Sequence, residues 1–139
     1  MSTVTWLNVA WRYLGVGEIP GPADSPAVEA FHDSVDASDA GDDVAWCSAF
    51  VNYCMEQAGL PGTDSRAARS WLDWGISVDP PLYGCVCVLW RGSPSSWKGH
   101  VGFWIDEIGD EVVMLGGNQG NQVSVRRYPK SRVLGYRWM

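Results

Sequence analysis

The sequence of 139 residues is 46% hydrophobic, which is enough for one compact domain with a buried core. Its 10 basic and 16 acidic residues give a formal net charge of -6, so nucleic acid is not expected as a partner. Neither a signal peptide nor an apolar run long enough to span a membrane is found. We therefore expect a single domain over residues 1–139, made in the cytoplasm, whose four cysteines are thiols.

Three segments carry apolar residues at helical spacing. Residues 5–15 (TWLNVAWRYLG) are expected to form the first helix. Residues 25–35 (SPAVEAFHDSV) are expected to form a short helix with Ser25 as its cap and Pro26 at its first position. Residues 63–75 (TDSRAARSWLDWG) are expected to form a third helix, which ends at their final glycine.

Beyond residue 75 the apolar pattern changes from that of helices to that of strands. Five short runs rich in β-branched and aromatic residues are separated by Gly, Pro, Asp and Asn: residues 85–91, 100–108, 111–117, 122–128 and 133–138. Such runs are typical of consecutive antiparallel strands. Helices followed by strands predict an α+β domain, with N-terminal helices packed on a C-terminal antiparallel sheet.

A further helix is predicted around DDVAWCSAFVNYC, and it ends at Gly59. Asp42 or Asp43 would cap it, which places Cys47 just past the first turn. Unpaired N–H groups and the positive end of the helix dipole favour a thiolate there, as a nucleophile requires. The two aspartates oppose this effect if they face the sulfur, so Cys47 is either a nucleophile or an ordinary core cysteine.

A cysteine nucleophile needs a base, and the chain has two histidines. His100 opens the strand run GHVGFW, where neighbouring glycines are expected to leave space for a substrate. His32 lies at the polar end of a short helix, where a solvated histidine is the simpler interpretation. The sequence therefore favours His100 as the partner of Cys47.

The base in turn needs a group that orients it through its other ring nitrogen. Asn118, in LGGNQGNQV, follows a strand that is expected to lie beside the one with His100. The same residues are good hairpin-turn chemistry, and from their types alone a simple turn is favoured over a catalytic role.

The motifs WCSAFVNYC, ARSWLDWG, GHVGFW and LGGNQGNQV, with a closing YRW, resemble a known family. They are similar to the phage-type cysteine, histidine-dependent amidohydrolase/peptidase (CHAP) hydrolases, which are related to the NlpC/P60 proteins. The resemblance covers nearly the whole chain. It implies a papain-like fold, with Cys47 as nucleophile, His100 as base and Asn118 as the residue that orients the base.

The resemblance also implies a function, that of a single-domain phage endolysin. The expected substrate is bacterial peptidoglycan, cleaved at the muramoyl-alanine or a stem-peptide amide through a cysteine thioester. The enzyme would be a monomer that reaches the cell wall through a holin-like pore or another export route. A catalytically silent wall-binding module and an acyltransferase with the same Cys/His pair are the alternatives.

Candidate substrate-binding residues come from three places in the sequence. Trp46 stands next to the nucleophile, and Trp104 shares a strand face with His100, so both are candidates for the walls of a groove. Glu18 lies in a Gly/Pro-rich loop, and similar sequences resemble this chain at that position. Its carboxylate would either meet an amine of the stem peptide or hold the loop.

No metal site and no cofactor are expected. The four cysteines lack the paired C-x-x-C spacing of zinc sites. Asp36, Asp39, Asp42 and Asp43 resemble the calcium loop of some related hydrolases, but their spacing differs from D-x-D-x-D-G. A solvated acidic loop is the expected interpretation.

Overall fold

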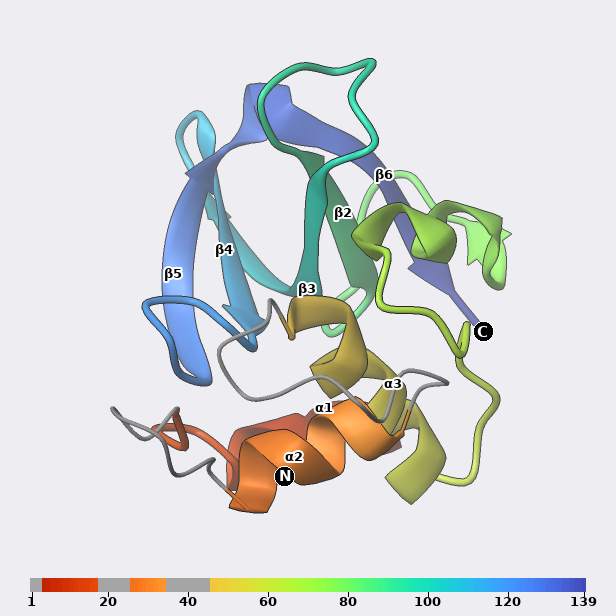
Figure 1. Cartoon of the computed structure of the whole chain (residues 1–139). Coiled ribbons are helices and arrows are strands. Elements are labelled where there is room, and N and C mark those ends of the chain that lie inside the picture. Colours follow the sequence, from red (N-terminus) through yellow and green to blue (C-terminus); the bar gives the residue numbers. More distant parts are fainter. Residues whose placement is uncertain (1–3, 18–25, 35–45) are drawn as a thin grey trace.

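The computed structural model describes residues 4–17, 26–34 and 46–139 (Figure 1). Four helical elements of this part of the chain precede most of the sheet: α1 (Thr5–Arg12), α2 (Pro26–Asp33), α3 (Cys47–Gln57) and the 3-10 helix η1 (Ala68–Asp73). The predicted helices over residues 5–15 and 25–35 are confirmed as α1 and α2. Pro26 is the first residue of α2, where its missing N–H costs no helical hydrogen bond.

Six strands form one antiparallel sheet: β1 (Ile76–Ser77), β2 (Val86–Trp90), β3 (Gly99–Ile108), β4 (Glu111–Gly116), β5 (Ser124–Pro129) and β6 (Val133–Trp138). Their spatial order is β1-β6-β2-β3-β4-β5, so β2 to β5 are neighbours both in sequence and in space. The short 3-10 helix η2 (Lys130–Arg132) follows the edge strand β5, and β6 then pairs with β2. The predicted α+β class is confirmed, and so are the five strand segments.

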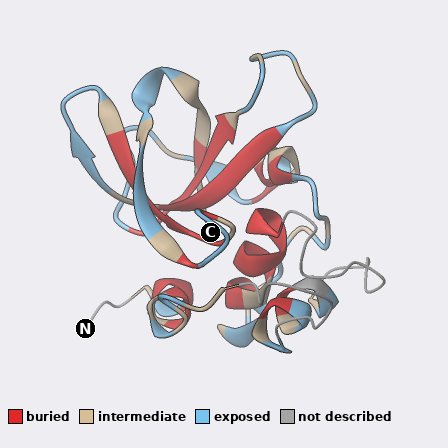
Figure 2. Ribbon diagram, turned by 60° about the vertical axis from the view of Figure 1, so that its left-hand side comes forward, coloured by how far each residue is buried: buried red, intermediate tan, exposed pale blue. Residues whose placement is uncertain are grey.

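The helix α3 lies at the centre of the domain, between the sheet and the other two α-helices (Figure 1). Buried residues gather where α3 and the sheet face each other (Figure 2). Most of its side chains are buried: Cys47, Ser48, Ala49, Phe50, Val51, Asn52, Cys54 and Met55. Because interiors are close-packed, a helix enclosed in this way holds its first residue in a fixed position against the sheet.

Aromatic side chains join α2 to α3. The ring of Phe31 lies 5.0 Å from that of Phe50 and 5.1 Å from that of Tyr53, both in edge-to-face contact. It also stacks on Trp46 at 5.6 Å. Trp46 is fully buried, which leaves it no surface for a substrate. The prediction of Trp46 as a groove wall is therefore wrong: an aromatic residue next to a nucleophile packs here into the core.

A second, smaller apolar cluster lies on the opposite side of the strands from the main core. Its buried members alternate along the strands with residues of the main core: Cys85, Cys87, Leu89, Val112, Met114 and Tyr136. Trp104 packs against this cluster. His100 points to the same face, because it lies four residues before Trp104 on β3 and pairs with Leu89 of β2.

The predicted helix over residues 63–75 is only partly formed. The side chain of Asn52 accepts hydrogen bonds from the backbone N–H groups of Thr63 (2.8 Å) and Asp64 (2.9 Å), and Asp64 has a φ of 54°. A left-handed residue interrupts a right-handed helix, so this end of the segment is a loop. Only residues 68–73 turn, and they do so as the 3-10 helix η1.

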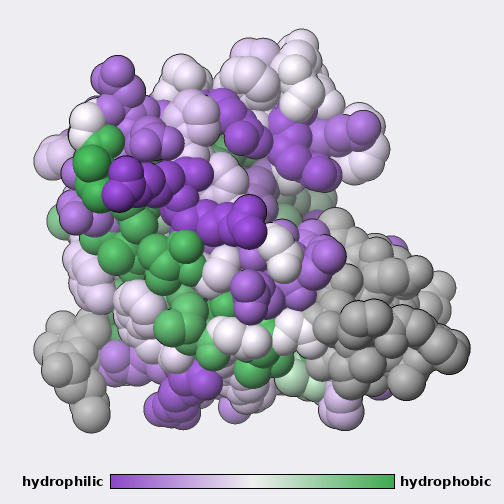
Figure 3. All heavy atoms as spheres, turned by 90° about the vertical axis from the view of Figure 1, so that its left-hand side faces the viewer, coloured by the Kyte–Doolittle hydropathy of each residue, from purple (hydrophilic) through white to green (hydrophobic). Residues whose placement is uncertain are grey.

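No helix within the described ranges is long and apolar enough to cross a membrane. The face that carries β5 shows hydrophilic side chains above an apolar patch (Figure 3). On β5 itself, Val125 and Arg127 are exposed, and Arg127 lies 3.9 Å from Glu111 across the strand pair.

Candidate active site

Cys47 is the first residue of α3, one turn earlier in the helix than the sequence suggested. The flanking residue Trp46 makes no side-chain capping bond, and its carbonyl accepts the first helical hydrogen bond from Phe50 (2.9 Å). The proposed caps Asp42 and Asp43 lie outside the described residues. At this position the N–H groups of the first turn have no partner within the helix, and that of Ser48 reaches the Cys47 sulfur.

The environment of Cys47 favours its thiolate. Burial alone raises the pKa of the thiol, but a hydrogen bond and a charge interaction with His100 lower it. The backbone N–H groups of Val101 and Ser48 lower it further, and the net pKa falls below the ordinary value of 9.0. A helix start and a strand start therefore meet to form a hydrogen-bonded thiol–imidazole pair.

The other cysteines have the opposite environment. Burial raises the pKa of Cys85 to about 11, and it raises the pKa of Cys54 and Cys87 well above 9.0. All four cysteines are free thiols, as predicted. Only Cys47 thus combines a lowered pKa with contact to a base.

The second ring nitrogen of His100 bonds to Gln119. The distance from His100 Nε2 to Gln119 Oε1 is 2.9 Å, and both side chains are buried. The amide nitrogen of Gln119 donates to the carbonyl oxygens of Ser124 (2.8 Å) and Met114 (3.2 Å). Because those oxygens only accept, the amide cannot be flipped, and His100 Nε2 must carry the proton. His100 Nδ1 is left to face the thiol.

The residue that contacts His100 is thus Gln119 and not Asn118, to which the sequence assigned this position. Asn118 is half-buried and has a φ of 58°. It lines a pocket together with Cys47 and His100. The left-handed conformation of Asn118 reverses the chain, and the next side chain, that of Gln119, contacts His100. Gly116 makes room for it, since a Cβ there would lie 2.6 Å from Gln119 Oε1. The segment is both the turn and the source of the orienting group, so the two alternatives are compatible.

Two pockets meet at Cys47. One, of about 240 Å³, is lined by His100, Asn118, Gln119 and polar or basic side chains that include Arg126 and Tyr128. The other, of about 390 Å³, is lined by Ala67, Ala68 and Trp97, among others. Cys47, Arg91 and Gly99 border both, so the two pockets adjoin at Cys47, and together they are called the groove. A larger hollow of about 570 Å³ lies between α1 and the end of α3, away from Cys47.

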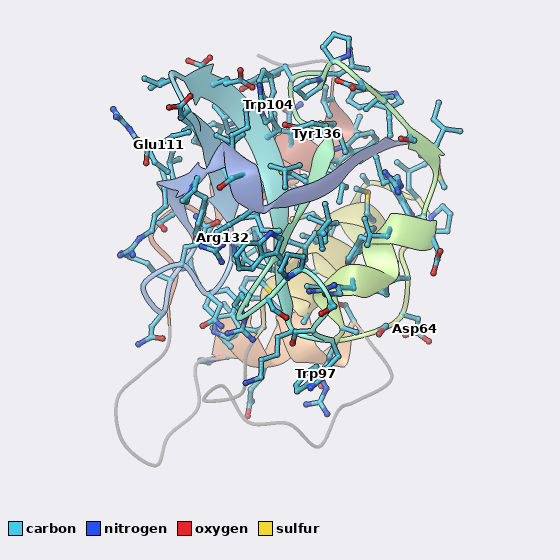
Figure 4. All side chains as sticks on the ribbon, turned by 90° about the horizontal axis from the view of Figure 1, so that it is seen from above. Asp64, Trp97, Trp104, Glu111, Arg132 and Tyr136 are labelled. Carbon is cyan, nitrogen blue, oxygen red and sulfur yellow. The ribbon has the colours of Figure 1, made fainter. Side chains whose placement is uncertain are left out.

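Trp97, and not the predicted Trp104, is the tryptophan in this groove. Trp97 is 78% exposed on the loop between β2 and β3. Trp104 lines neither pocket, and the view from above shows Trp97 and Trp104 far apart, with Arg132 between them (Figure 4). The prediction for Trp104 is wrong because a strand face that begins at His100 runs on into the second apolar cluster. Trp97 lies in no periodic pattern, so its place in the pocket was not predictable from the sequence.

A pocket does lie beside His100, which lines it together with Gly99, but the glycines serve strand packing. A Cβ on Gly99 would lie 2.9 Å from the carbonyl oxygen of Leu89, and one on Gly102 would lie 3.1 Å from that of Leu115. The glycines therefore permit close strand packing, and the substrate space lies in the groove.

Two side chains hold the loops that wall the groove. Arg69 donates to three carbonyl oxygens of the loop with Trp97, those of Lys98 (2.8 Å), Pro94 (2.9 Å) and Ser93 (3.1 Å). Asn52, on α3, holds the loop before Ala67 through both its oxygen and its nitrogen. The helix that begins at Cys47 thus also positions one wall of the groove.

Several residues singled out in the sequence are not described. Glu18, Asp36 and Asp39 lie outside the described residues, and so their predicted roles stay predictions. His32 belongs to α2.

No family model matches the sequence, and no curated protein matches it either. A solved structure from Staphylococcus aureus subsp. aureus Mu50, described as similar to a lipoprotein of the NLP/P60 family, does match, with a TM-score of 0.55 and 18% identity. The chain has an NlpC/P60-like fold. The match covers 96% of this chain but 40% of the other, so the chain spans less than half the length of that protein.

Within this NlpC/P60-like fold, a thiol, an imidazole and an amide form one hydrogen-bonded series. The amide fixes the imidazole tautomer, which leaves the other ring nitrogen able to accept the thiol proton. The ring centres of Tyr128 and His100 lie 5.2 Å apart. Burial raises the pKa of Tyr128 to about 12, so its hydroxyl stays neutral. Such a site can carry out nucleophilic attack on a carbonyl.

Proposed function

We propose that this protein is a cysteine hydrolase that cleaves an amide bond of bacterial peptidoglycan. The observation that carries the proposal is the series from Cys47 through His100 to Gln119 at the middle of an open groove. A silent binding module has no need of a lowered thiol pKa or of a fixed imidazole tautomer. The peptidoglycan substrate is supported by the NlpC/P60-like fold and by the resemblance of the sequence motifs.

The mechanism follows from the geometry of the three side chains. The Cys47 thiolate attacks the amide carbonyl while its proton is held on His100 Nδ1. The tetrahedral intermediate collapses, the C–N bond breaks, and His100 gives that proton to the leaving amine. Water then adds to the thioester, with His100 as base, and releases the carboxylate and the free thiol. Gln119 accepts a hydrogen bond from His100 Nε2 throughout, as its positioning residue.

The first N–H groups of α3 supply charge stabilisation. They point out of the helix start next to Cys47, where the negative oxygen of the tetrahedral intermediate forms. A single such donor is worth about 100- to 1,000-fold in rate in other hydrolases.

Digestion of purified peptidoglycan tests the proposal. Wild type and Cys47→Ala are incubated with the polymer, and the fragments are read by mass spectrometry. New amine ends made by the wild type alone are expected, and the fragment masses identify the bond. Reducing sugar ends in place of amine ends would mean a glycosidase, and amine ends made equally by Cys47→Ala would exclude the cysteine mechanism.

We propose further that the biological setting is that of an endolysin. Lysis of permeabilised Gram-negative cells by the added protein is the expected result. Digestion of purified peptidoglycan without lysis of such cells would contradict this setting but not the hydrolase.

A further inference from the structure

The groove is lined by arginines although the chain as a whole is acidic. Arg91, Arg126 and Arg132 border the pocket that holds Cys47 and His100. Arg66 and Arg91 border the second pocket. The whole chain has a net charge of -6, so this concentration of positive charge does not follow from composition.

No carboxylate of the described residues faces these arginines. The residues described as lining the two pockets include neither Asp nor Glu. The ion pairs within the described part of the chain lie elsewhere, between Arg127 and Glu111 and between Lys130 and Glu107. Guanidinium groups gathered without counter-charges repel one another, and an anionic ligand removes that repulsion.

Three of the arginines are held in place while the terminal amino groups of their guanidinium groups stay free to bind a ligand. Arg91 Nε donates to the carbonyl of Gly99 (3.0 Å), and Arg132 Nε donates to that of Trp90 (3.0 Å). Arg132 also lies over the rings of Trp90 and Tyr128, 5.8 Å from each ring centre. Arg126 packs against Gly120, whose lack of a side chain makes room for the guanidinium. Among the described residues, their terminal amino groups have no hydrogen-bond partner, and such planar forks match carboxylates.

We propose that the groove selects a substrate with a carboxylate next to the scissile amide, and that Arg91, Arg126 and Arg132 bind this carboxylate. The inference rests on the proposed hydrolase function and adds the charge of its substrate. It also explains how an acidic protein recognises an acidic polymer: the attraction is local to the groove, where a stem peptide with free carboxyl groups would lie.

Two alkylating reagents of similar size test the subsite without any need for hydrolysis. Iodoacetate carries a carboxylate beside its reactive carbon, whereas iodoacetamide carries a neutral amide. The readout is the rate of Cys47 alkylation by iodoacetate divided by that by iodoacetamide. Both rates are measured by mass spectrometry of the peptide that contains Cys47. Because any change in the Cys47 pKa affects both rates, the ratio isolates the binding of the carboxylate.

The matched variants are Arg126→Gln and Arg127→Gln. These neighbours lose the same charge, but Arg126 pairs with Met114 on the groove side of the sheet, whereas Arg127 pairs with Val113 on the other side. The ratio is expected to fall about two- to fivefold in Arg126→Gln, the range of a partly exposed ion pair, and to stay unchanged in Arg127→Gln. An equal ratio in Arg126→Gln and wild type, or an equal fall in both variants, would overturn the proposal.

The wild type alone gives a second readout should Arg126→Gln fail to fold. Its ratio is expected to fall as NaCl rises from about 0.02 M to about 0.5 M, since salt screens exposed charges. A ratio that does not respond to salt would count against the subsite.

A peptidoglycan arm separates this inference from the proposed function. The wild type is given native peptidoglycan and the same material with its carboxyl groups amidated. Faster cleavage of the native polymer supports both claims, and equal cleavage overturns the subsite alone. If neither polymer is cleaved but the alkylation ratio behaves as expected, the hydrolase proposal fails and the anion subsite stands.

Discussion

At the scale of single residues, Gln119 is the side chain that decides the state of His100. Its oxygen is fixed toward His100 Nε2 because its nitrogen is committed to two carbonyl oxygens. Gln119→Ala removes a buried hydrogen bond, worth about 1–3 kcal/mol, and kcat for amide release is expected to fall about 10- to 100-fold. Asn118→Ala is the neighbouring control, and its kcat is expected to fall less. A larger loss in Asn118→Ala than in Gln119→Ala would return the orienting role to Asn118.

The pH dependence of Cys47 alkylation tests its electrostatic environment. The pKa of Cys47 is lowered in the folded protein, so the thiolate persists at pH values below 9.0 and is lost only as the pH falls through the lowered pKa. Iodoacetamide should therefore react at lower pH than it does with an ordinary thiol. In His100→Ala the lowering by the imidazole is lost, and the midpoint of the rate profile is expected to move upward. A midpoint that is unchanged in His100→Ala would show that the imidazole does not act on the thiol.

Residue types and order were enough to predict that Cys47 and His100 contact each other, because the chain has few cysteines and histidines. They were not enough to choose between Asn118 and Gln119. That choice depends on which turn residue takes a positive φ, and Asn118 takes it at 58°. Trp46 and Trp104 failed as groove residues for a similar reason: next to an active site, a core tryptophan and a substrate-binding one look the same in sequence.

At the scale of elements, α3 and the loop over residues 61–67 act as a unit. Asn52 is buried on α3 and bonds to the backbone of Thr63, Asp64 and Ser65. Gly62 lies so close to the Asn52 oxygen that a Cβ there would clash with it. The loop is thus built around this one amide.

Asn52→Ala is expected to leave the part-buried backbone groups of Thr63, Asp64 and Ser65 without their side-chain partner. Each unsatisfied group costs about 1–3 kcal/mol, so the free energy of unfolding should fall by about 2–4 kcal/mol after partial relaxation. Urea denaturation measures this change. Gln57→Ala removes an amide from an exposed position of the same helix and should change it by less than about 0.5 kcal/mol. Similar values for the two variants would show that the loop does not depend on Asn52.

The contact between Asn52 and this loop explains why apolar periodicity did not predict the structure of residues 63–67. The apolar spacing of residues 63–75 is helical, yet Asn52 on α3 holds Thr63 and Asp64 in a loop in which Asp64 has a φ of 54°. The segments of α1, α2 and the strands were predictable from spacing alone.

At the scale of the whole molecule, the order of helices and strands was sufficient to predict the α+β fold and its antiparallel sheet. The strand order was not, because β6 crosses back to pair with β2 through contacts between distant residues. This crossing matters for the site, since η2 places Arg132 beside the pocket with His100. The charge of the molecule is equally uneven: an acidic chain encloses an arginine-lined groove, which net charge cannot reveal.

Titration of Cys47 against activity tests the central claim, that this thiol carries out the hydrolysis. Samples of the wild type are alkylated with iodoacetamide to different extents, the modified fraction of Cys47 is measured by mass spectrometry, and amine release from peptidoglycan is assayed in each. Because the other three cysteines are fully buried, Cys47 is expected to react first. Residual activity should fall in proportion to the modified fraction of Cys47 and vanish when all of it is modified. Full activity in a sample with Cys47 completely alkylated would exclude Cys47 as the nucleophile.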